Sequence, residues 1–535
     1  MHPEMEVPRK TWGAWLESKR ILRHLRYLSL RFTSASIKGK SSPMPAPVET
    51  PLIKPSDANS WSSCVRRVWL DNMKRVELVP ATDVFGQLII DLGMRHEQLV
   101  LDRLSSMAAV KTATSPEDTN RLIEDRTPII YQAQLLDQEN GIIGFPDFLI
   151  LNESGEYQAA DAKLALNENK KEIQVQLGVY RHLLRKKLNS QLPAIVFLGN
   201  GRQGFIAEEA DQITDQFLTQ MRKLLSSKVE PLVRYSHSKC RACPYYIHCK
   251  PAFEAKGELS LLYGMQGRAA SALEHAGICT ITQLAATNPD SIPDVPYLKG
   301  CEKKLRVVSQ AKSHLTGEVI QLAPVSLPVG HWIHFDIEDN PLTANGEKHV
   351  YLWGFLVPEL TKDGKQDLFE FVWTDHTDED EQGWLQFLAQ VEHYRQQHQD
   401  LILAHYSNHE KTTIRSYAKR YSMEDNETVV YLLSDAGPLF DMQKPVLKSL
   451  VLPIQGYGLK DICKHKDLVN FQWQDDDAGS QWSVVQFNRF LAQSNVEAKE
   501  KLKADILSYN RDDVMATREL EKWLRTKFIA SADPG

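Results

Sequence analysis

Apolar and polar positions along this chain repeat with two periods, one typical of strands and one typical of helices. The runs 144–150 and 157–164 are strand-like, and Asp147 is embedded in the first of them. In the second run, Asp161 and Lys163 are two positions apart, so a strand would place them on the same face. An apolar stripe at helical spacing then follows, formed by Ile173, Leu177 and Leu184. The pattern predicts a strand pair followed by an amphipathic helix.

A second alternating pattern begins late in the chain. Residues 331–338 place Asp336 and Glu338 on one strand face and apolar side chains on the other. Further strand-like runs follow at 350–355, 368–373 and 401–406. The first three runs predict an antiparallel meander, and the fourth leads into a helix that contains Glu410. A final amphipathic helix is predicted to begin at Tyr509 and to include Asp513.

These patterns divide the chain into parts, because 535 residues exceed the length of one ordinary domain. We expect four segments: 1–51, 52–255, 256–318 and 331–528. The first is basic and predicted to be disordered, the second and fourth mix strands and helices, and the third consists of short helices with glycine turns. The expected class is multidomain α/β. An acidic stretch at 375–381 is predicted to be a solvated loop.

Composition narrows the class of protein without naming a partner. The chain is 42% hydrophobic and 25% charged, as in globular proteins, and its net charge of −6 argues neither for nor against nucleic acid. No apolar run approaches the roughly 20 residues that cross a bilayer, so no membrane partner is expected. The odd number of cysteines, seven, and the lack of a secretory signal favour a metal site rather than a disulfide framework. They also favour a cytoplasmic location.

The first candidate chemistry lies on the predicted strand pair. Asp147 and Asp161 would meet Lys163 at one end of the pair. Two carboxylates can hold Mg2+ or Mn2+, which polarises a phosphate and generates hydroxide, and the lysine can stabilise the developing charge. His96, on a helix predicted to open at 92–97, is a candidate further ligand.

Gln176 and Tyr180 complete this constellation, because positions i and i+4 share one face of a helix. The order His, Gly-x-x-Asp, Asp-x-Lys and Gln-x-x-x-Tyr resembles the RecB-like branch of the PD-(D/E)XK nucleases. The resemblance implies a restriction-endonuclease-like core. It also implies three metal ligands (His96, Asp147 and Asp161), a catalytic lysine (Lys163) and a flanking pair (Gln176 and Tyr180).

Four cysteines flank this region: Cys64 before it, and Cys240, Cys243 and Cys249 after it. Four thiolates suit an iron–sulfur cluster or Zn2+, and either would join the two ends of the domain. Nucleases of the resembling branch often have this split arrangement around a 4Fe-4S cluster. The resemblance therefore implies that cluster, with Zn2+ as the alternative.

The middle segment contains glycines at turn positions before helical runs, as in a helix-hairpin-helix module. Gly264, Gly267 and Gly277 mark the turns, and Arg268 adds a positive charge. Backbone N–H groups at such turns and helix starts bind phosphate without reading sequence. The segment is predicted to bind nucleic acid, and an ordinary packed helical linker is the alternative.

The late pattern holds a second set of carboxylates: Asp336, Glu338, Glu410 and Asp513. With Tyr509 four residues before Asp513, this set resembles the DEDD exonucleases, most closely their YprB-like RNase H branch. The resemblance implies two cations held by the carboxylates and a water oriented by Tyr509. Asp512 is a plausible substitute for Asp513, whereas Asp441 is expected to be structural.

Together these patterns predict a metal-dependent nuclease, and by resemblance an exonuclease, that acts on single-stranded DNA or DNA ends. DNA is favoured over RNA as the nucleic-acid partner. The alternative is a nucleic-acid-binding scaffold in which one or both nuclease folds are catalytically degenerate. No Gly-x4-Gly-Lys-Ser/Thr motif occurs, so strand opening would fall to a separate helicase or to frayed ends.

Overall fold

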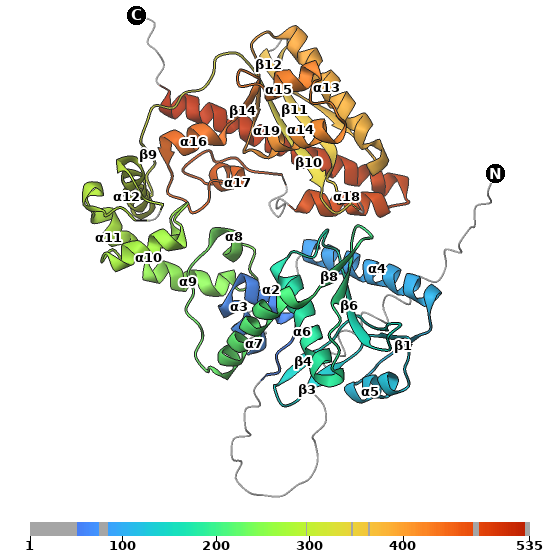
Figure 1. The fold of residues 1–535 in the computed structure, drawn as a ribbon. Helices are drawn as coiled ribbons and strands as arrows, with labels where there is room; N and C mark the ends of the chain where they lie inside the picture. Colours follow the sequence, from blue (N-terminus) through green and yellow to red (C-terminus); the bar gives the residue numbers. More distant parts are fainter. Residues whose placement is uncertain are drawn as a thin grey trace, which may run out of the picture. The chain divides into compact units, whose positions relative to one another are not determined.

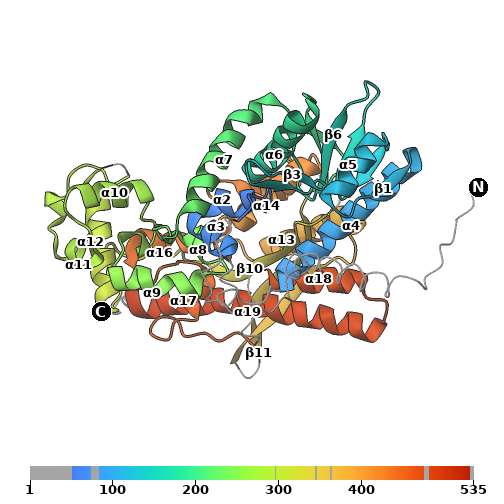
Figure 2. The same cartoon turned by 90° about the horizontal axis from the view of Figure 1, so that it is seen from below.

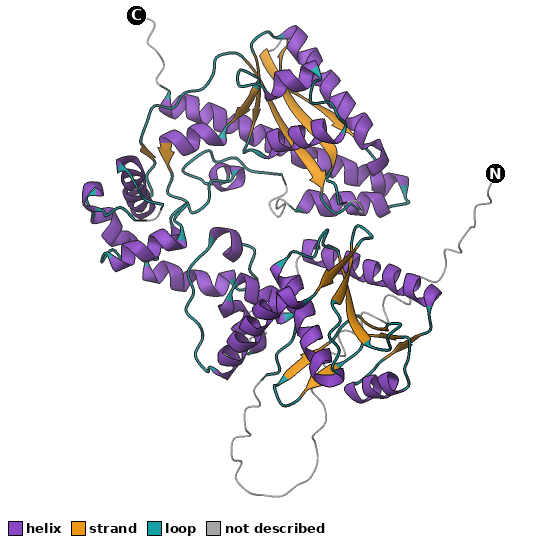
Figure 3. Cartoon of the chain, in the orientation of Figure 1, coloured by secondary structure: helices purple, strands orange, loops and turns teal. Residues whose placement is uncertain are grey.

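The structure is a computed structural model that describes most of the chain after residue 50. The described residues are 51–73, 84–295, 297–343, 346–361, 364–474 and 481–529. The predicted basic extension, 1–51, lies outside them except for Pro51. Figure 3 shows that helices and strands mix in the first and last parts of the chain, whereas the segment between them is helical.

The first α/β part contains a six-stranded sheet in the order β1-β2-β5-β6-β7-β8. Figure 1 labels β1, β6 and β8 of this sheet. Its strands are β1 (Val110–Thr112), β2 (Ile129–Tyr131), β5 (Phe148–Leu151), β6 (Tyr157–Lys163), β7 (Ala194–Leu198) and β8 (Gln203–Ile206). A small hairpin is formed by β3 (Leu135–Asp137) and β4 (Ile142–Gly144). β5 and β6 are the predicted antiparallel pair, and β6 runs parallel to β7.

Helices cover both faces of this sheet. Phe148 and Ala160 pack with α4 on one face, while Leu149 and Ala159 pack with α6 and α7 on the other. The helices are α2 (Asp57–Ser63), α3 (Val65–Asn72), α4 (Val84–Met107), α5 (Pro116–Glu124), α6 (Lys171–Leu188), η2 (Glu208–Ala210) and α7 (Asp211–Ser226). Side chains that alternate along a strand therefore divide between two cores, as the period of two requires.

Two boundaries here differ from prediction. The helix that carries His96 begins at Val84 rather than Leu92. Asp147 lies one residue before β5 instead of inside a strand. Pro146 accounts for the second difference, because proline has no N–H to donate to a strand ladder.

The middle segment is built from short helices around one apolar cluster that includes Leu259, Leu273, Leu284 and Val308. They are α8 (His237–Cys240), α9 (Tyr246–Lys256), η3 (Leu259–Leu261), α10 (Gly267–His275), α11 (Ile281–Ala286), η4 (Pro289–Ser291) and α12 (Cys301–Thr316). Gly264 and Gly277 adopt positive φ angles of 73° and 86°, which glycine tolerates best, so both glycines mark real turns.

The second α/β part contains a five-stranded sheet in the order β12-β11-β10-β13-β14. Its strands are β10 (His331–Asn340), β11 (His349–Thr361), β12 (Gly364–Trp373), β13 (Leu401–His405) and β14 (Leu439–Asp441). β10, β11 and β12 form the antiparallel meander, and β13 joins β10 in parallel. A separate short pair is formed by β9 (Ile320–Gln321) and β15 (Leu450–Val451).

Helices again lie on both faces of the sheet. Phe335, Trp353 and Phe355 pack against α13–α15, and Figures 1 and 2 show α19 against the sheet beside β10 and β11. The helices are η5 (Thr377–Glu379), α13 (Asp380–Gln397), α14 (His409–Arg420), α15 (Glu427–Leu433), α16 (Gln443–Ser449), α17 (Leu459–Cys463), α18 (Trp482–Ala492) and α19 (Val496–Phe528).

Two predictions in this part were wrong. The last helix begins at Val496, where the Asn495 side chain caps it, so Tyr509 and Asp513 lie well inside it. The acidic stretch at 375–381 is not wholly solvated, because Asp380 is buried and accepts hydrogen bonds from Arg420 and two tyrosine hydroxyls. Burial of this carboxylate is compensated by those donors. Among the described helices, none combines the length and apolar character that a bilayer crossing requires.

Candidate active sites

The first candidate site lies where β5 begins and β6 ends. The Asp147 carboxylate accepts a hydrogen bond from the Ala162 N–H (2.9 Å), and the Asp147 N–H donates to the Asp161 carboxylate (3.2 Å). Lys163 Nζ lies 2.7 Å from Asp161 Oδ2. The antiparallel pairing of the two strands thus brings the three predicted residues together, although they are up to 16 positions apart in sequence.

This site has more negative than positive charge. Burial, and then repulsion from Asp161 and Glu97, raises the pKa of Asp147 well above its usual value, and Lys163 only partly opposes that shift. For Lys163, burial lowers the pKa, but attraction to Asp161, Asp147 and Glu97 outweighs it and raises the pKa overall. The lysine is therefore a stable cation, and a divalent ion would relieve the remaining repulsion.

The helix α6 supports the Asp161 carboxylate from beside the sheet. Gln176 Nε2 donates to Asp161 Oδ2 (3.0 Å) and to the Tyr180 hydroxyl (3.1 Å). The Tyr180 hydroxyl donates to the Phe145 carbonyl (3.0 Å). The i, i+4 pair therefore forms one hydrogen-bonded chain that sets the orientation of Asp161.

The helix α4 contributes a residue that the sequence reasoning missed. His96, the predicted ligand, has Nε2 2.9 Å from the Phe197 carbonyl. Its neighbour Glu97 is buried and accepts hydrogen bonds from the Tyr131 hydroxyl (2.7 Å) and Gln132 Nε2 (2.9 Å). Since Glu97 also raises the pKa of Asp147, it belongs to the same electrostatic site. In the sequence, the only signal for Glu97 was an acidic residue within a predicted helix.

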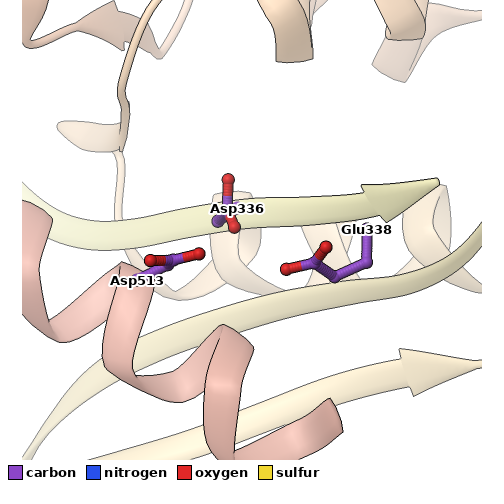
Figure 4. Close-up of side chains that lie close together, drawn as sticks. All are labelled: Asp336, Glu338 and Asp513. Carbon is purple, nitrogen blue, oxygen red and sulfur yellow. The ribbon is translucent and has the colours of Figure 1, made fainter. Parts of the chain in front are cut away.

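The second candidate site joins β10 to α19. Asp336, Glu338 and Asp513 each offer a carboxylate oxygen, and these oxygens all lie within 4.8 Å of one another (Figure 4). Glu338 and Asp513 are buried, at 7% and 9% exposure. Such a group of hard oxygen ligands suits Mg2+ or Mn2+.

Without a cation, burial and mutual repulsion make the ionised form of these carboxylates unfavourable. Burial, and then repulsion from its carboxylate neighbours, raises the pKa of Asp336 well above its usual value and that of Glu338 to about 8. Burial also raises the pKa of Asp513. Asn510 Nδ2 donates to Asp336 Oδ2 (3.0 Å) and Glu338 Oε1 (3.4 Å), and Ser483 donates to Glu338. Neutral donors reduce the repulsion but do not cancel charge.

The side chains around this carboxylate group include both predicted and unpredicted residues. Trp473 Nε1 donates to Asp513 Oδ1 (2.7 Å). Asp512, the substitute considered for Asp513, accepts the Gln474 N–H (2.8 Å) and is not in the carboxylate group. The hydroxyl of Tyr509 accepts a hydrogen bond from Lys460 Nζ (2.7 Å), and neither Lys460 nor Trp473 was predicted.

Glu410 stands apart from the other carboxylates. Its Oε2 lies 2.9 Å from His405 Nδ1, and both side chains are buried. Among the described residues it does not join the group of three, although its charge contributes to raising the pKa of Asp336. Asp441 accepts the N–H groups of Ser407 and Gln443, each at 2.9 Å, which is the structural role expected of it.

Comparison with known families follows the same division of the chain. Residues 54–250 match the PD-(D/E)XK nuclease superfamily, and residues 333–525 match the RNase H superfamily. The chain contains one domain of each superfamily. No curated protein matches the sequence. The crystal structure of SSO0001 aligns at 12% identity over 44% of this chain and 97% of that chain, with a TM-score of 0.22.

The candidate cluster cysteines lie at the edge of the PD-(D/E)XK domain. Cys249 is buried, Cys240 and Cys243 pack against the same apolar cluster, and Cys64 caps α3. Burial raises the pKa of Cys240, Cys243 and Cys249, the last to about 11, and repulsion between the thiolates, including Cys64, contributes in each case. Among the described residues, no three of these sulfur atoms lie within 4.8 Å of one another.

The middle segment, between the PD-(D/E)XK and RNase H domains, contains a pocket of about 720 Å3 at the start of α10. Gly267 and Arg268 line it, together with Gln266, Arg234 and the half-exposed ring of Tyr297. The first N–H groups of a helix have no partner inside the helix, so those of Gly267 and Arg268, which line this pocket, are potential donors. Gly264 and Gly277 shape the turns on either side of α10.

Proposed function

We propose that this protein is a metal-dependent nuclease that hydrolyses phosphodiester bonds at two active sites. The observation that carries the proposal is the group of three carboxylates, Asp336, Glu338 and Asp513, whose oxygens lie within 4.8 Å of one another and of which the last two are buried. Three clustered acids, two of them buried, are costly to a fold unless a cation compensates their charge. Membership of two nuclease superfamilies supports the same reaction for both domains.

In the RNase H domain, Asp336, Glu338 and Asp513 would hold Mg2+ or Mn2+. The ion would polarise the scissile phosphate and lower the pKa of a bound water. Tyr509 is four residues before Asp513 and would orient that water, as in exonucleases of the DEDD type. Glu410, paired with His405, is the least direct ligand of the four carboxylates, and a second cation would have to recruit it.

In the PD-(D/E)XK domain, Asp147 and Asp161 would hold the cation, with Glu97 or His96 completing its ligands. Lys163 would stabilise charge that develops on the phosphate, because its ammonium is held 2.7 Å from Asp161 and stays protonated. Gln176 would act through Asp161, whose carboxylate it contacts. This is the arrangement expected of the RecB-like branch.

The four cysteines are proposed to hold a 4Fe-4S cluster rather than Zn2+. Around a single Zn2+, Zn–S bonds of about 2.3 Å place neighbouring sulfurs about 4 Å apart. A 4Fe-4S cluster spans a larger volume, and the resemblance to the RecB-like branch favours it. The charges of the Cys64, Cys240, Cys243 and Cys249 thiolates interact with one another. Protein purified without oxygen should absorb visible light and contain iron and sulfide. Stoichiometric zinc in a colourless protein would overturn the cluster.

The substrate is proposed to be single-stranded DNA or DNA ends, with DNA favoured over RNA. Gly267 and Arg268 would bind phosphate in a helix-hairpin-helix manner, while the exposed ring of Tyr297 could stack on an unpaired base. A separate helicase would supply single strands from duplex DNA. The proposed location is the cytoplasm.

The decisive experiment compares cleavage of end-labelled single- and double-stranded DNA and RNA with Mg2+, Mn2+ or a chelator. The wild type should cut only with metal. Covalently closed DNA circles, which have no ends, should resist an exonuclease. Lys163→Ala with Asp336→Ala should be inert, and each single variant should retain the activity of the other site. Cleavage by the double variant at the wild-type rate would refute both site assignments. Tight binding without any cleavage by wild type would instead indicate the scaffold.

A further inference from the structure

A lysine lies within the carboxylate site of the RNase H domain, where none of the predicted motifs placed one. Lys460, from α17, donates from Nζ to the Tyr509 hydroxyl (2.7 Å). The same Nζ lies 4.3 Å from the centroid of the Tyr509 ring and 5.5 Å from that of Trp473. Trp473 in turn donates to Asp513. One ammonium therefore lies beside two aromatic side chains, Tyr509 and Trp473, that both contact Asp513.

The surroundings of Lys460 are both apolar and acidic. Burial lowers its pKa, and attraction to Asp513, Glu338 and Asp336 opposes that shift. The three carboxylates and the ammonium add to a net charge of about −2 when all are ionised, which a single divalent cation neutralises. Without the ammonium the same group would have a net charge of about −3.

We propose that Lys460 is a positioning residue that sets the hydroxyl of Tyr509 for the reaction and limits the charge at the metal site. This inference rests on the proposed function of the RNase H domain. An ammonium has only donors, so it takes one lone pair of the phenol oxygen, while the phenol proton is directed to the Asp513 carboxylate. The other lone pair of the phenol oxygen can then accept a hydrogen bond from the attacking water, which fixes the orientation of that water.

The experiment isolates the RNase H site by using Asp161→Asn in every protein, so that the PD-(D/E)XK site is silent. On that background, Lys460→Met should lower kcat about 10- to 100-fold with little change in KM, because a misplaced reacting group affects turnover more than binding. Lys460→Arg keeps a donor and a charge and should recover part of the loss. Lys466→Met, at an exposed lysine of the same segment, is the matched control and should leave the rate unchanged.

Two further measurements separate positioning from a general loss of structure. Tyr509→Phe removes the hydroxyl, so adding Lys460→Met to it should cost little more in kcat. Titration with Mn2+ should show tighter binding by Lys460→Met than by its parent, because the site has gained net negative charge. A merely structural lysine would instead weaken both metal binding and thermal stability.

The outcomes distinguish the two levels of inference. If the Asp161→Asn background cuts nucleic acid and Lys460→Met cuts equally well, Lys460 is not a positioning residue while the domain remains a nuclease. Independent, additive losses from Lys460→Met and Tyr509→Phe would also overturn the inference. If the background does not cut at all, and Asp513→Asn binds Mn2+ as well as its parent, the proposed function of this site fails and the Lys460 inference fails with it.

Discussion

Gly354→Ala should damage the RNase H site although it adds only a methyl group on a neighbouring strand. Gly354 is paired with Asp336 across β10 and β11. A Cβ at this position would lie 1.8 Å from Asn510 Oδ1 and 3.0 Å from Asn510 Cγ. Asn510 is fully buried, and its Nδ2 donates to Asp336 and Glu338. The methyl group therefore has to displace the amide that bridges the two carboxylates.

The expected cost follows from those contacts. Inserting a methyl group into a packed core costs about 1–3 kcal/mol. Loss of the hydrogen bonds from Asn510 to the buried carboxylates adds about 1–2 kcal/mol. Without the clash, alanine would stabilise the strand relative to glycine by about 0.5–1 kcal/mol. The sign of the change in unfolding free energy therefore shows whether the clash occurs. We expect the RNase H domain to lose about 2–4 kcal/mol of unfolding free energy.

Calorimetric or urea unfolding measures this loss, and the RNase H domain is assigned to the transition whose response to Mg2+ is abolished by Asp513→Asn. Gly93→Ala is the matched control, because a Cβ there meets nothing within 4 Å and the residue lies within α4. That control should be stabilised by up to about 1 kcal/mol. In the Asn510→Ala background, Gly354→Ala should cost much less than in the wild type. Wild-type stability and turnover in Gly354→Ala alone would refute this reasoning.

Three other predictions test the two sites. Asp161→Asn should abolish cleavage by the PD-(D/E)XK domain but not by the RNase H domain, and Asp513→Asn should have the reciprocal effect. Cleavage of end-labelled DNA by each variant measures both. Tyr180→Phe should lower the rate of the first site only about tenfold or less, because it loses the bond to the Phe145 carbonyl while Gln176 still contacts Asp161. In chelator, the RNase H domain should lose stability as pH rises from about 4.5 to about 8. In that window the raised pKa of Glu338 makes the folded state bind more protons than the unfolded state. Melting curves across that range should show the loss and its reversal by Mg2+, and a flat profile without metal would contradict the charge repulsion described for this site.

Alternation along the strands was sufficient to predict part of each site. A period of two places Asp161 with Lys163, and Asp336 with Glu338, on one face whatever else the chain does. The order of motifs predicted both superfamilies and the helix that brings Gln176 beside Asp161. Boundaries were harder to predict, because Pro146 interrupts a strand and Asn495 starts a helix long before its catalytic candidates.

What the sequence determined by itself was therefore local: which side chains share a strand face or a helix face, and which domains they belong to. Only the tertiary structure decided which distant groups meet them. Glu97 acts on Asp147, Glu410 is paired with His405, and Lys460 contacts Tyr509. The physical reason is that periodicity fixes the direction of a side chain relative to its own element. Burial and charge compensation depend on residues that are far apart in the sequence. Lys460 and Tyr509 are 49 positions apart, and Asp336 and Asn510 are much farther apart.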